Sequence, residues 1–595
     1  NYTMVIVMGF LLIFSGLFIF INNQLDQTIL SFLSIILKQP VDIQWYSLLK
    51  FIAIELFYSG ILLLLFSFIV KKIFSNGRSF KDNQIHIFII GLILIIFIWL
   101  PVIIFGRNCF IEGIRYWWLH DDAMISMRYA LNFSSGYGLV WNQGEIVEGY
   151  TNFLWTIYMS LIHFIGIPKS TTSLFIIITN VFLAIFTIPY IIKLVDLIGG
   201  GILAAISAVI CYTLNGDALI WATNGHEMTL ISFLVVFSAC RVIEESKNNK
   251  VNILTYFIIA IISIIRADAA ILSGLLYVLS FILNKNKSQV FKLTIISLII
   301  PLCHLTFRFL YYGELLPNTA YLKVSNWDDR VSIGLSYTIN FLKSYFLIFI
   351  IIFTGSIHYF DKIKIYLLSG IVIYGLYITY VGGDAFDHFR FFIPILPFMI
   401  ILAFLFIEQF KVSYYSKLLI IMICIISTPI IFPGYIFNYI YHIDYNRTNR
   451  KNLDIAIFLK NNVASDSKVA DFFGGLVFYF SGVKGIDLLG KSDKHIARLK
   501  AVKGRKIPGH TKVDFDYSVG KLKPDFIVTD LKLPFGNSDN LSFRSDTGSY
   551  KGNLYYNKGF RTHCLPYPIN NKTWRSIVVC DWSNQFSYWQ TRLDK

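Results

Sequence analysis

The chain has 595 residues, of which 55% are hydrophobic, with a mean hydropathy of +0.61 and a formal net charge of +16. Such an apolar composition lies far above that of soluble globular domains and excludes an ordinary soluble protein. Apolar runs long enough to cross a bilayer recur through the first three quarters of the chain. The composition therefore predicts a polytopic α-helical membrane protein.

Fourteen apolar segments are candidate membrane spans. They lie near residues 4–22, 47–70, 85–105, 151–166, 173–192, 201–214, 228–241, 252–264, 270–283, 293–308, 335–354, 364–380, 391–408 and 417–433. Residues 1–22 lack a basic start and a small-residue cleavage site, so we expect the first span to be retained.

Basic residues in the connectors indicate how the spans are oriented. The connectors predicted to be cytoplasmic contain Lys71, Lys247, Lys285, Lys362 and Lys411. The loops 106–150, 309–334 and 382–390, the turns at Glu227 and Arg266, and the tail from 434 then fall on the opposite face. Because this orientation needs an odd number of spans, we expect about 13, with one segment between 151 and 214 re-entrant or half-spanning.

The tail, residues 434–595, is predicted to be an extracytoplasmic soluble domain of mixed α/β structure. Short apolar runs at Lys468–Phe473, Asp525–Thr529 and Ser576–Cys580 predict strands, and residues 452–463 predict an amphipathic helix. The tail has 25 Lys and Arg against 14 Asp, which is about +11 of the total charge. A basic domain beside a membrane can attract anionic lipid headgroups or an anionic glycan, or it can simply be solvated. Nucleic acid is the weaker alternative, because a domain on the outer face would rarely meet it.

Seven cysteines are present, and five lie in or beside membrane segments, where a thiol usually packs as a small apolar group. Cys564 and Cys580 lie in the tail, and an oxidising compartment would allow them to form a disulfide. No Cys/His spacing indicates a zinc site.

Polar residues interrupt the apolar pattern mainly on the predicted outer face. They include Asp121, Asp122, Glu227, Arg266, Asp268, the run 308–323, and Asp384, Asp387, His388 and Arg390. Each can be explained structurally, since a carboxylate at a helix start is favourable for the helix dipole and neighbouring charges neutralise each other. Together they offer carboxylates for general-base catalysis, cations for a phosphate, and aromatic rings that can stack on a sugar.

Three runs in the loop after residue 106 resemble the first extracytoplasmic loop of bacterial GT-C type membrane glycosyltransferases. They are Asp121-Asp-Ala-Met-Ile-Ser-Met-Arg-Tyr-Ala, Gly136-Tyr-Gly-Leu-Val-Trp-Asn-Gln-Gly-Glu and Val147-Glu-Gly-Tyr-Thr-Asn-Phe-Leu-Trp. The nearest group is that of the mycobacterial terminal arabinofuranosyltransferases and their Gram-negative relatives. Further similar runs are Tyr311–Thr319, Gly382–Arg390, Ile486–Asp493 and Pro508–His510.

The resemblance covers about residues 85–595 and implies three regions. Residues 1–84 would be an extension with two extra transmembrane helices. Residues 85–433 would be a GT-C-like transmembrane catalytic domain with its catalytic loop at 106–150. Residues 434–595 would be the periplasmic domain of a protein in the bacterial inner membrane.

The resemblance also implies an inverting glycosyltransferase that moves a sugar from a polyprenyl-phosphate donor to a hydroxyl of a cell-envelope glycan. The catalytic base would be Asp121 or Asp122, with Asp121 preferred, because neighbouring helical residues point about 100° apart and rarely share one role. Arg128 would orient this pair. The donor phosphate would bind Arg308, Lys323, Arg390 and, less directly, Arg266. The sugar or acceptor would contact Glu148, Tyr150, Asn152, Glu227, Tyr312, Asn318, Asp384 and His388.

A divalent cation is a possible cofactor. The carboxylates of Glu227 and Asp384 would bind either the sugar hydroxyls or this cation. The abundance of Ile, Phe, Asn and Lys indicates an AT-rich genome, which favours lipopolysaccharide over arabinan as the acceptor glycan.

Three other functions stay open. A transporter or lipid flippase would place its charges near the bilayer midplane in broken helices, whereas here they cluster at one face. A non-catalytic relative would bind a glycan without needing the two aspartates. An oligosaccharide transferase to protein lacks support, because no peptide-acceptor signature is present.

Overall fold

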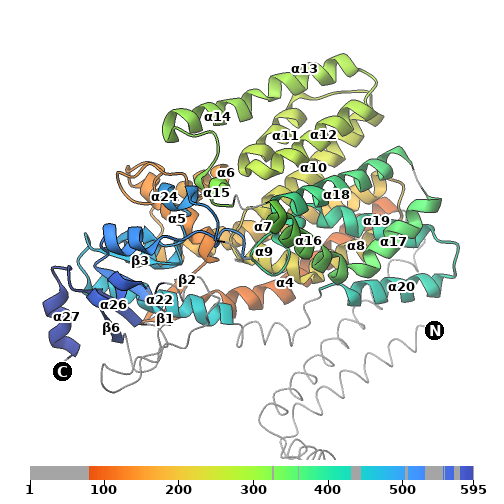
Figure 1. Cartoon of the computed structure of the whole chain (residues 1–595). Coiled ribbons are helices and arrows are strands. Elements are labelled where there is room, and N and C mark those ends of the chain that lie inside the picture. Colours follow the sequence, from red (N-terminus) through yellow and green to blue (C-terminus); the bar gives the residue numbers. More distant parts are fainter. Residues whose placement is uncertain are drawn as a thin grey trace, which may run out of the picture.

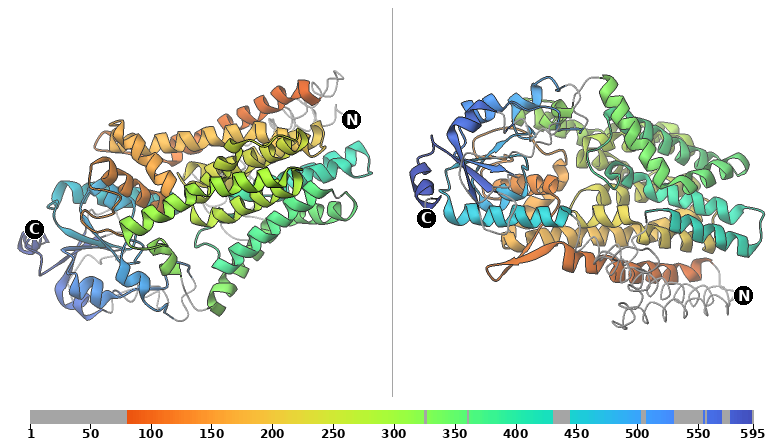
Figure 2. Two further views of the ribbon diagram at one scale, coloured as in Figure 1. Left: turned by 90° about the horizontal axis from the view of Figure 1, so that it is seen from above. Right: turned by 60° about the horizontal axis from the view of Figure 1, so that its bottom comes forward.

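The computed structural model describes residues 80–323, 327–359, 361–429, 444–502, 507–529, 554, 557–568 and 576–593. The predicted spans near 4–22 and 47–70 lie outside the described residues. Figures 1 and 2 show a body of helices with a five-stranded sheet at one end of it.

The helical body contains the apolar runs of the sequence, one or two helices to each run. Its main helices are α4 (Phe80–Gly106), α6 (Phe153–Phe164), α7 (Lys169–Leu197), α8 (Ile202–Leu214), α9 (Gly216–Thr223), α10 (Met228–Lys247), α11 (Ile253–Ile265), α12 (Ala270–Leu283), α13 (Lys287–Ser297), α14 (Ile299–Tyr312), α16 (Trp327–Ser344), α17 (Phe346–His358), α18 (Lys362–Val381), α19 (Leu396–Gln409) and α20 (Tyr414–Ser427). The elements between them are β1 (Asn108–Ile111), β2 (Ile114–Trp117), α5 (Asp121–Ser134), η1 (Ala267–Ala269), α15 (Asn318–Lys323) and η2 (Arg390–Ile395).

Five described helices are long and apolar enough to cross a membrane, or seven if each of two bent pairs is one span. The bent pairs are α9 with α10, at 117°, and α16 with α17, at 82°. Two of the three segments predicted between 151 and 214 are short. Helices α6 and α8 have 12 and 13 residues, about 18–20 Å, against a hydrocarbon core of about 30 Å. The predicted number of 13 spans includes these short helices and segments outside the described residues, and it stays a prediction.

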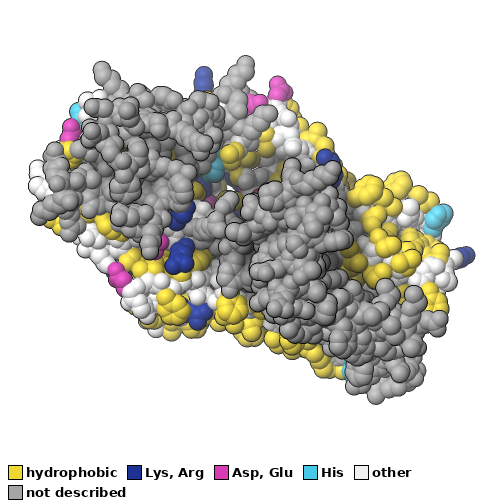
Figure 3. Space-filling model, turned by 90° about the horizontal axis from the view of Figure 1, so that it is seen from below, with side chains coloured by type: hydrophobic (Ala, Val, Ile, Leu, Met, Phe, Trp, Pro, Cys, Tyr) yellow, Lys and Arg dark blue, Asp and Glu magenta, His cyan; other side chains and the backbone are white. Residues whose placement is uncertain are grey.

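Large hydrophobic side chains are exposed over the helical body, including Phe97, Leu310, Phe353 and Leu376. Figure 3 shows that the described surface over the helices is mainly hydrophobic, whereas charged side chains gather toward the end that holds the sheet. Side chains of this kind on a helix surface are those expected to face lipid.

The tail forms one mixed sheet in the order β4-β3-β5-β7-β6. Its strands are β3 (Lys468–Asp471), β4 (Lys484–Asp487), β5 (Phe526–Thr529), β6 (Cys564–Pro568) and β7 (Ser576–Cys580), so the three predicted strands are confirmed. Strands β4, β3 and β5 are parallel, and β7 and β6 are antiparallel to their neighbours. The helices of the tail are α22 (Asp444–Asn462), α23 (Leu476–Ser481), α24 (Lys494–Arg498), η3 (Asp516–Lys521), α26 (Lys558–His563) and α27 (Phe586–Leu593).

Alternate side chains of a strand point to opposite faces of a sheet, and in this sheet both faces are buried. Phe526 and Val528 pack with Ile455 of α22 and with residues of α5, whereas Ile527 and its neighbour Val578 pack in a second cluster. The amphipathic helix predicted at 452–463 corresponds to the C-terminal half of α22, which covers one face of the sheet.

Helix α5 lies between the helical body and the sheet (Figure 1). Arg128 of α5 donates to the carbonyl oxygens of Trp141 (2.6 Å), Phe478 (2.5 Å) and Val483 (2.8 Å), and to Oδ1 of Asn142 (3.1 Å). The expectation that Arg128 orients the two aspartates is therefore wrong. Its side chain instead fastens the tail to α5.

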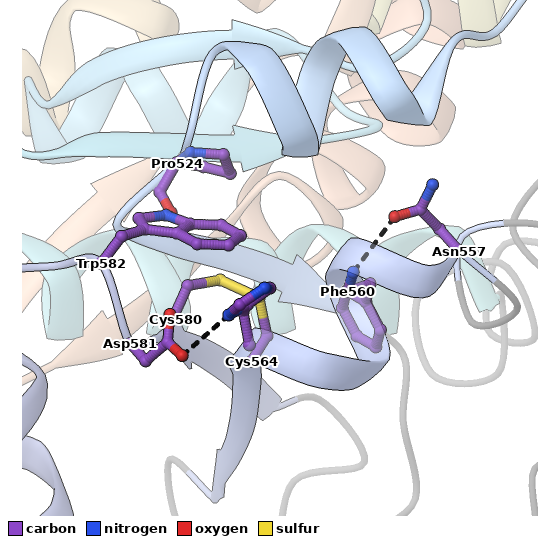
Figure 4. The surroundings of a disulfide bond; sticks show 8 residues. Pro524, Asn557, Phe560, Cys564, Cys580, Asp581 and Trp582 are labelled. Atoms are coloured by element: carbon purple, nitrogen blue, oxygen red, sulfur yellow. Dashed lines mark hydrogen bonds and ion pairs between the residues drawn. A yellow bond between two sulfur atoms is a disulfide. The ribbon is translucent and has the colours of Figure 1, made fainter.

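Cys564 and Cys580 form a disulfide between the paired strands β6 and β7 (Figure 4). Beside it, the indole Nε1 of Trp582 donates to the carbonyl of Pro524 at 2.8 Å. The predicted pairing of these two cysteines is present in the structure, and the other five cysteines are free.

Replacing Arg128 by Met should lower the thermal unfolding midpoint of the detergent-solubilised protein. The change removes four buried hydrogen bonds between α5, its following loop and the tail, at a cost of about 3 kcal/mol. Arg115→Met is the matched control, because that side chain is partly exposed and its described hydrogen bonds go to Asn108 and the Ile104 carbonyl, not to the tail. Equal midpoints for both variants would show that Arg128 does not clamp the tail.

A maleimide that labels denatured protein should reach five cysteines before reduction and seven after it. In Cys564→Ser the count should be six in both conditions, because Cys580 then has no partner. Intact mass spectrometry counts the labels. Seven labels on unreduced wild type would contradict the disulfide.

Candidate active site

A partly open cavity lies where α5, the loop after it, several helix ends and the tail meet. Its charged and polar lining is contributed by Asp122, Ser126, Asn152, His226, Glu227, Arg266, Lys323, Asp384, Arg390, Lys491 and His510. These residues are distant in sequence, and the cavity forms only when the tail is docked on the helical body.

Asp122 is the carboxylate of the Asp pair that faces this cavity. One of its oxygens lies 2.5 Å from Nζ of Lys491 and the other 3.5 Å from a terminal nitrogen of Arg390. Burial raises the pKa of Asp122, but the two cations outweigh burial and hold that pKa well below its usual value. Asp122 is therefore ionised at neutral pH.

Asp121 points away from the cavity, into the contact with the tail. Its Oδ1 accepts a hydrogen bond from the backbone amide of Leu476 at 2.9 Å, and only 7% of the residue is exposed. Burial raises the pKa of Asp121 to about 6. The preference for Asp121 as the base is corrected by this placement, since no substrate in the cavity would touch it.

Arg390 forms a two-pronged ion pair with Asp384 in the cavity. Its Nε lies 2.7 Å from Oδ2 of Asp384, and a terminal nitrogen donates to Oδ1 at 2.8 Å. The guanidinium also lies over the rings of Trp221, Phe386 and Phe391, at 5.1–5.5 Å from their centroids. The rings and Asp384 hold the guanidinium in one orientation, with one edge toward Asp122.

Arg266 and Glu227 form a second buried pair on the same wall, 2.8 Å apart. Arg266 also contacts Asp268, two residues along the chain, at 2.7 Å. This contact agrees with the expectation that these neighbouring charges neutralise each other. The other oxygen of Glu227 accepts from Nδ2 of Asn152 at 2.8 Å, and Oδ1 of Asn152 accepts from Ser126. Glu227 and Asp268 together neutralise the charge of Arg266, so Arg266 is already paired.

Lys323 differs from the other cations of the cavity. It makes no hydrogen bond or ion pair with any residue that the structure describes, and its Nζ lies over the ring of Phe391 at 5.1 Å. Burial lowers the pKa of Lys323 to about 8, with Asp384 offsetting part of the shift. Its ammonium is therefore available to an anion.

Several residues predicted to contact the substrates do not line the cavity. Nε of Arg308 lies 2.7 Å from Oε2 of Glu148, and both side chains are buried. Burial raises the pKa of Glu148 to about 7, although Arg308 lowers it. This pair fastens the loop after α5 to α14, so Arg308 is not placed to hold a donor phosphate, and Glu148 is not placed to hold a sugar.

Three further predicted contacts are also structural. The hydroxyl of Tyr312 donates to the Leu139 carbonyl and lies 3.0 Å from the hydroxyl of Tyr150, which does line the cavity. Nδ2 of Asn318 donates to the carbonyls of residues 490, 491 and 493. Nδ1 of His388 contacts Asp217 at 2.9 Å, behind the cavity wall.

Lys491 is the charged cavity residue that the sequence interpretation missed, and Ser126, His226 and His510 of the lining were also not predicted. It lies in the loop after β4, where Asp487 accepts hydrogen bonds from the amides of residues 489, 490 and 492 and Asn318 holds the carbonyls. The similar run Ile486–Asp493 was the available signal. Nothing in that run distinguished Lys491 from the many other lysines of a basic tail.

His120, Asp122 and His226 offer ligand atoms that lie within 4.8 Å of one another. Both ring nitrogens of His226 are buried and lack a hydrogen-bond partner in the described structure. Two imidazoles and a carboxylate suit Zn²⁺ or another first-row divalent ion, so the donor set fits a metal. Lys491 and Arg390 on the same carboxylate oppose a second positive charge there.

No protein-family model matches the chain. One curated relative is the Terminal beta-(1->2)-arabinofuranosyltransferase of Mycobacterium tuberculosis, 26% identical over 250 residues, which are 39% of this chain and 38% of the relative. The matched part is thus well under half of that relative's length.

Two solved structures share the fold. ArnT from Cupriavidus metallidurans bound to undecaprenyl phosphate superposes with a TM-score of 0.54 at 10% identity, covering 84% of this chain and 98% of ArnT. The apo state of the same protein gives a TM-score of 0.52 with the same coverage. The chain therefore has the multi-pass membrane fold of ArnT and resembles the GT-C glycosyltransferases.

Proposed function

We propose that this protein is an inverting glycosyltransferase that transfers a sugar from a polyprenyl-phosphate donor to a hydroxyl of a cell-envelope glycan. The observation that carries the proposal is the cavity in which Asp122 lies beside Lys491 and Arg390 at the end of the membrane helices. The likeness to ArnT, solved with undecaprenyl phosphate, and to an arabinofuranosyltransferase supports a lipid-phosphate sugar as the donor.

The charges of the cavity suit such a donor. Four cations line it, Arg266, Lys323, Arg390 and Lys491, against the three carboxylates of Asp122, Glu227 and Asp384. Asp268, which pairs with Arg266, balances the fourth cation, so a phosphate would be held by cations already fixed beside the cavity and not by a surplus charge. Lys323 is the cation that has no hydrogen-bond or ion-pair partner among the described residues, and Arg390 is the one with a planar, oriented fork, so these two are the proposed phosphate ligands.

The reaction would use these groups as follows. An acceptor hydroxyl attacks the anomeric carbon, its proton passes to the carboxylate of Asp122, and the bond from that carbon to the phosphate oxygen breaks. The electron pair leaves with the polyprenyl phosphate, whose charge grows from −1 to −2. Cations fixed beside the phosphate stabilise this growing charge more in the transition state than in the ground state.

The outer face of the inner membrane is the proposed location of the reaction. The Cys564–Cys580 disulfide favours an oxidising compartment for the tail, and the tail supplies Lys491 to the cavity. Hydrophobic helix surfaces next to the cavity would let the polyprenyl chain stay in the bilayer. Lipopolysaccharide or a similar glycan is the proposed acceptor.

A divalent cation is compatible with His120, Asp122 and His226. Such an ion would act as a Lewis acid beside the phosphate. His226 would supply a neutral imidazole, and Asp122 would have to exchange Lys491 for the ion. The cation therefore enters the proposal as a possible cofactor and not as a required one.

Replacing Asp122 by Asn should slow sugar transfer about 10²–10⁴-fold, because the proton acceptor is lost. Asp121→Asn is the matched control, since Asn still accepts from the Leu476 amide. Burial raises the pKa of Asp121 to about 6, so its ionised form weakens the fold at neutral pH, and the neutral Asn should be tolerated. Transfer is measured with radiolabelled polyprenyl-phosphate sugars, together with release of polyprenyl phosphate.

Two results would overturn this assignment. Loss of transfer in Asp121→Asn with normal transfer in Asp122→Asn would return the role to Asp121. Binding of undecaprenyl phosphate without turnover of any donor by wild type would favour a non-catalytic glycan-binding relative or a lipid flippase.

Replacing Lys323 by Met should weaken binding of undecaprenyl phosphate about tenfold or more, because a charged hydrogen bond to the phosphate is lost. The fold should tolerate the change, since a partly buried ammonium with no ion-pair partner among the described residues costs desolvation energy. Lys343→Met, an exposed site on α16, is the control. Equal affinities of the two variants, measured by thermal shift against lipid concentration, would remove Lys323 from the phosphate site.

A further inference from the structure

The loop that carries Arg390 has an unusual backbone. Residues 382–389 join α18 to η2, and positive φ angles occur at Gly382 (94°), Gly383 (65°), His388 (65°) and Phe389 (46°). Residues with bulky side chains seldom adopt such angles. Two of them in succession, directly before a cavity residue, persist only if the surroundings hold them.

Asp217 of α9 contacts this turn on the side away from the cavity. Its Oδ1 lies 2.9 Å from Nδ1 of His388, and its Oδ2 accepts from the hydroxyl of Tyr345 at 2.8 Å. Trp221, on the next turn of α9, donates its Nε1 to the carbonyl oxygen of His388 at 2.5 Å. Asp217 is only 1% exposed, so its charge is committed to these two partners.

Packing restrains the rest of the loop. The ring of Phe389 lies against Tyr337 and Phe341, with centroids 5.7 and 5.3 Å apart. A Cβ on Gly383 would lie 2.7 Å from Cβ of Tyr337, so only glycine fits there. Both ends of the loop are thus fixed by α9 and α16.

The backbone direction set at His388 and Phe389 determines where Arg390 points. The Arg390 guanidinium contacts Asp384 of the same loop and reaches Asp122 across the cavity. His388 itself faces the other way, toward Asp217, and does not line the cavity. Its influence on a ligand must pass through Arg390.

We propose that Asp217 and His388 are positioning residues for the donor: the contact between His388 Nδ1 and the Asp217 carboxylate holds the turn that directs the Arg390 guanidinium to the donor phosphate. This inference rests on the proposed function, in which Arg390 binds that phosphate. The predicted role of His388 as a sugar ligand is thus replaced by a positioning role, because His388 lies behind the cavity wall.

Variants at His388 separate the contact from the backbone angle. His388→Ala loses the bond to Asp217 and should weaken undecaprenyl phosphate binding about tenfold. His388→Asn should restore binding to within about threefold of wild type, because its Nδ2 can reach the place of Nδ1 and Asn tolerates a left-handed backbone. Asp217→Ala should behave as His388→Ala does.

A double-mutant cycle tests whether the effect passes through Arg390. Undecaprenyl phosphate binding is measured for wild type, His388→Ala, Arg390→Gln and the double variant. If His388 acts only by placing Arg390, the double variant should bind no worse than Arg390→Gln alone. The matched cycle of His388→Ala with Lys323→Met should be close to additive, because Lys323 lies on α15 outside this loop.

The possible results distinguish a failure of this inference from a failure of the proposed function. Binding by wild type with additive effects in both cycles would overturn the positioning role and leave the proposed function standing. Failure of His388→Asn to restore binding would likewise count against it. Absence of undecaprenyl phosphate binding by wild type would overturn the proposed function and, with it, this inference.

Discussion

Arg128 carries its charge into the contact between α5 and the tail, where carbonyl and amide oxygens accept its hydrogen bonds. Burying a guanidinium is costly unless its donors are satisfied, so the tail is held in the one arrangement that satisfies them. Six residues before Arg128 on the same helix, Asp122 meets Lys491 of the tail. The position of a lysine in the cavity therefore depends on a clamp two helical turns away from it.

Helix α5 has three faces, and each has its own neighbour. Asp121 and Arg128 are seven residues apart, close to two full turns, so they share the face toward the tail. Asp122 and Ser126 are one turn apart and share the cavity. Met124 and Met127 pack on the helical body. This helix is thus the element through which the membrane helices, the tail and the cavity constrain one another.

Much of the fold follows from periodicity, and the cavity only in part. Apolar runs located most of the described helices, and short apolar runs bounded by turn residues located β3, β5 and β7, because burial alone dictates those patterns. The seven-residue spacing of Asp121 and Arg128 predicts one shared face of α5, but only the contacts with the tail show that this face turns away from the cavity. By contrast, whether Arg308 faces a cavity or Glu148, and whether Lys491 is one solvated lysine among many, depends on tertiary contacts that no local pattern encodes.

The balance of charge around Asp122 explains why both a cation and a phosphate can be considered at the same place. Lys491 and Arg390 hold the carboxylate of Asp122 ionised, but they also place two positive charges beside it. Without other ligands, these charges oppose a divalent ion at His120, Asp122 and His226. A bound phosphate changes that balance, because it attracts the same cations and adds its own negative charge. Metal affinity should therefore rise with lipid phosphate in the cavity, and the two ligands would bind cooperatively through the charges they share.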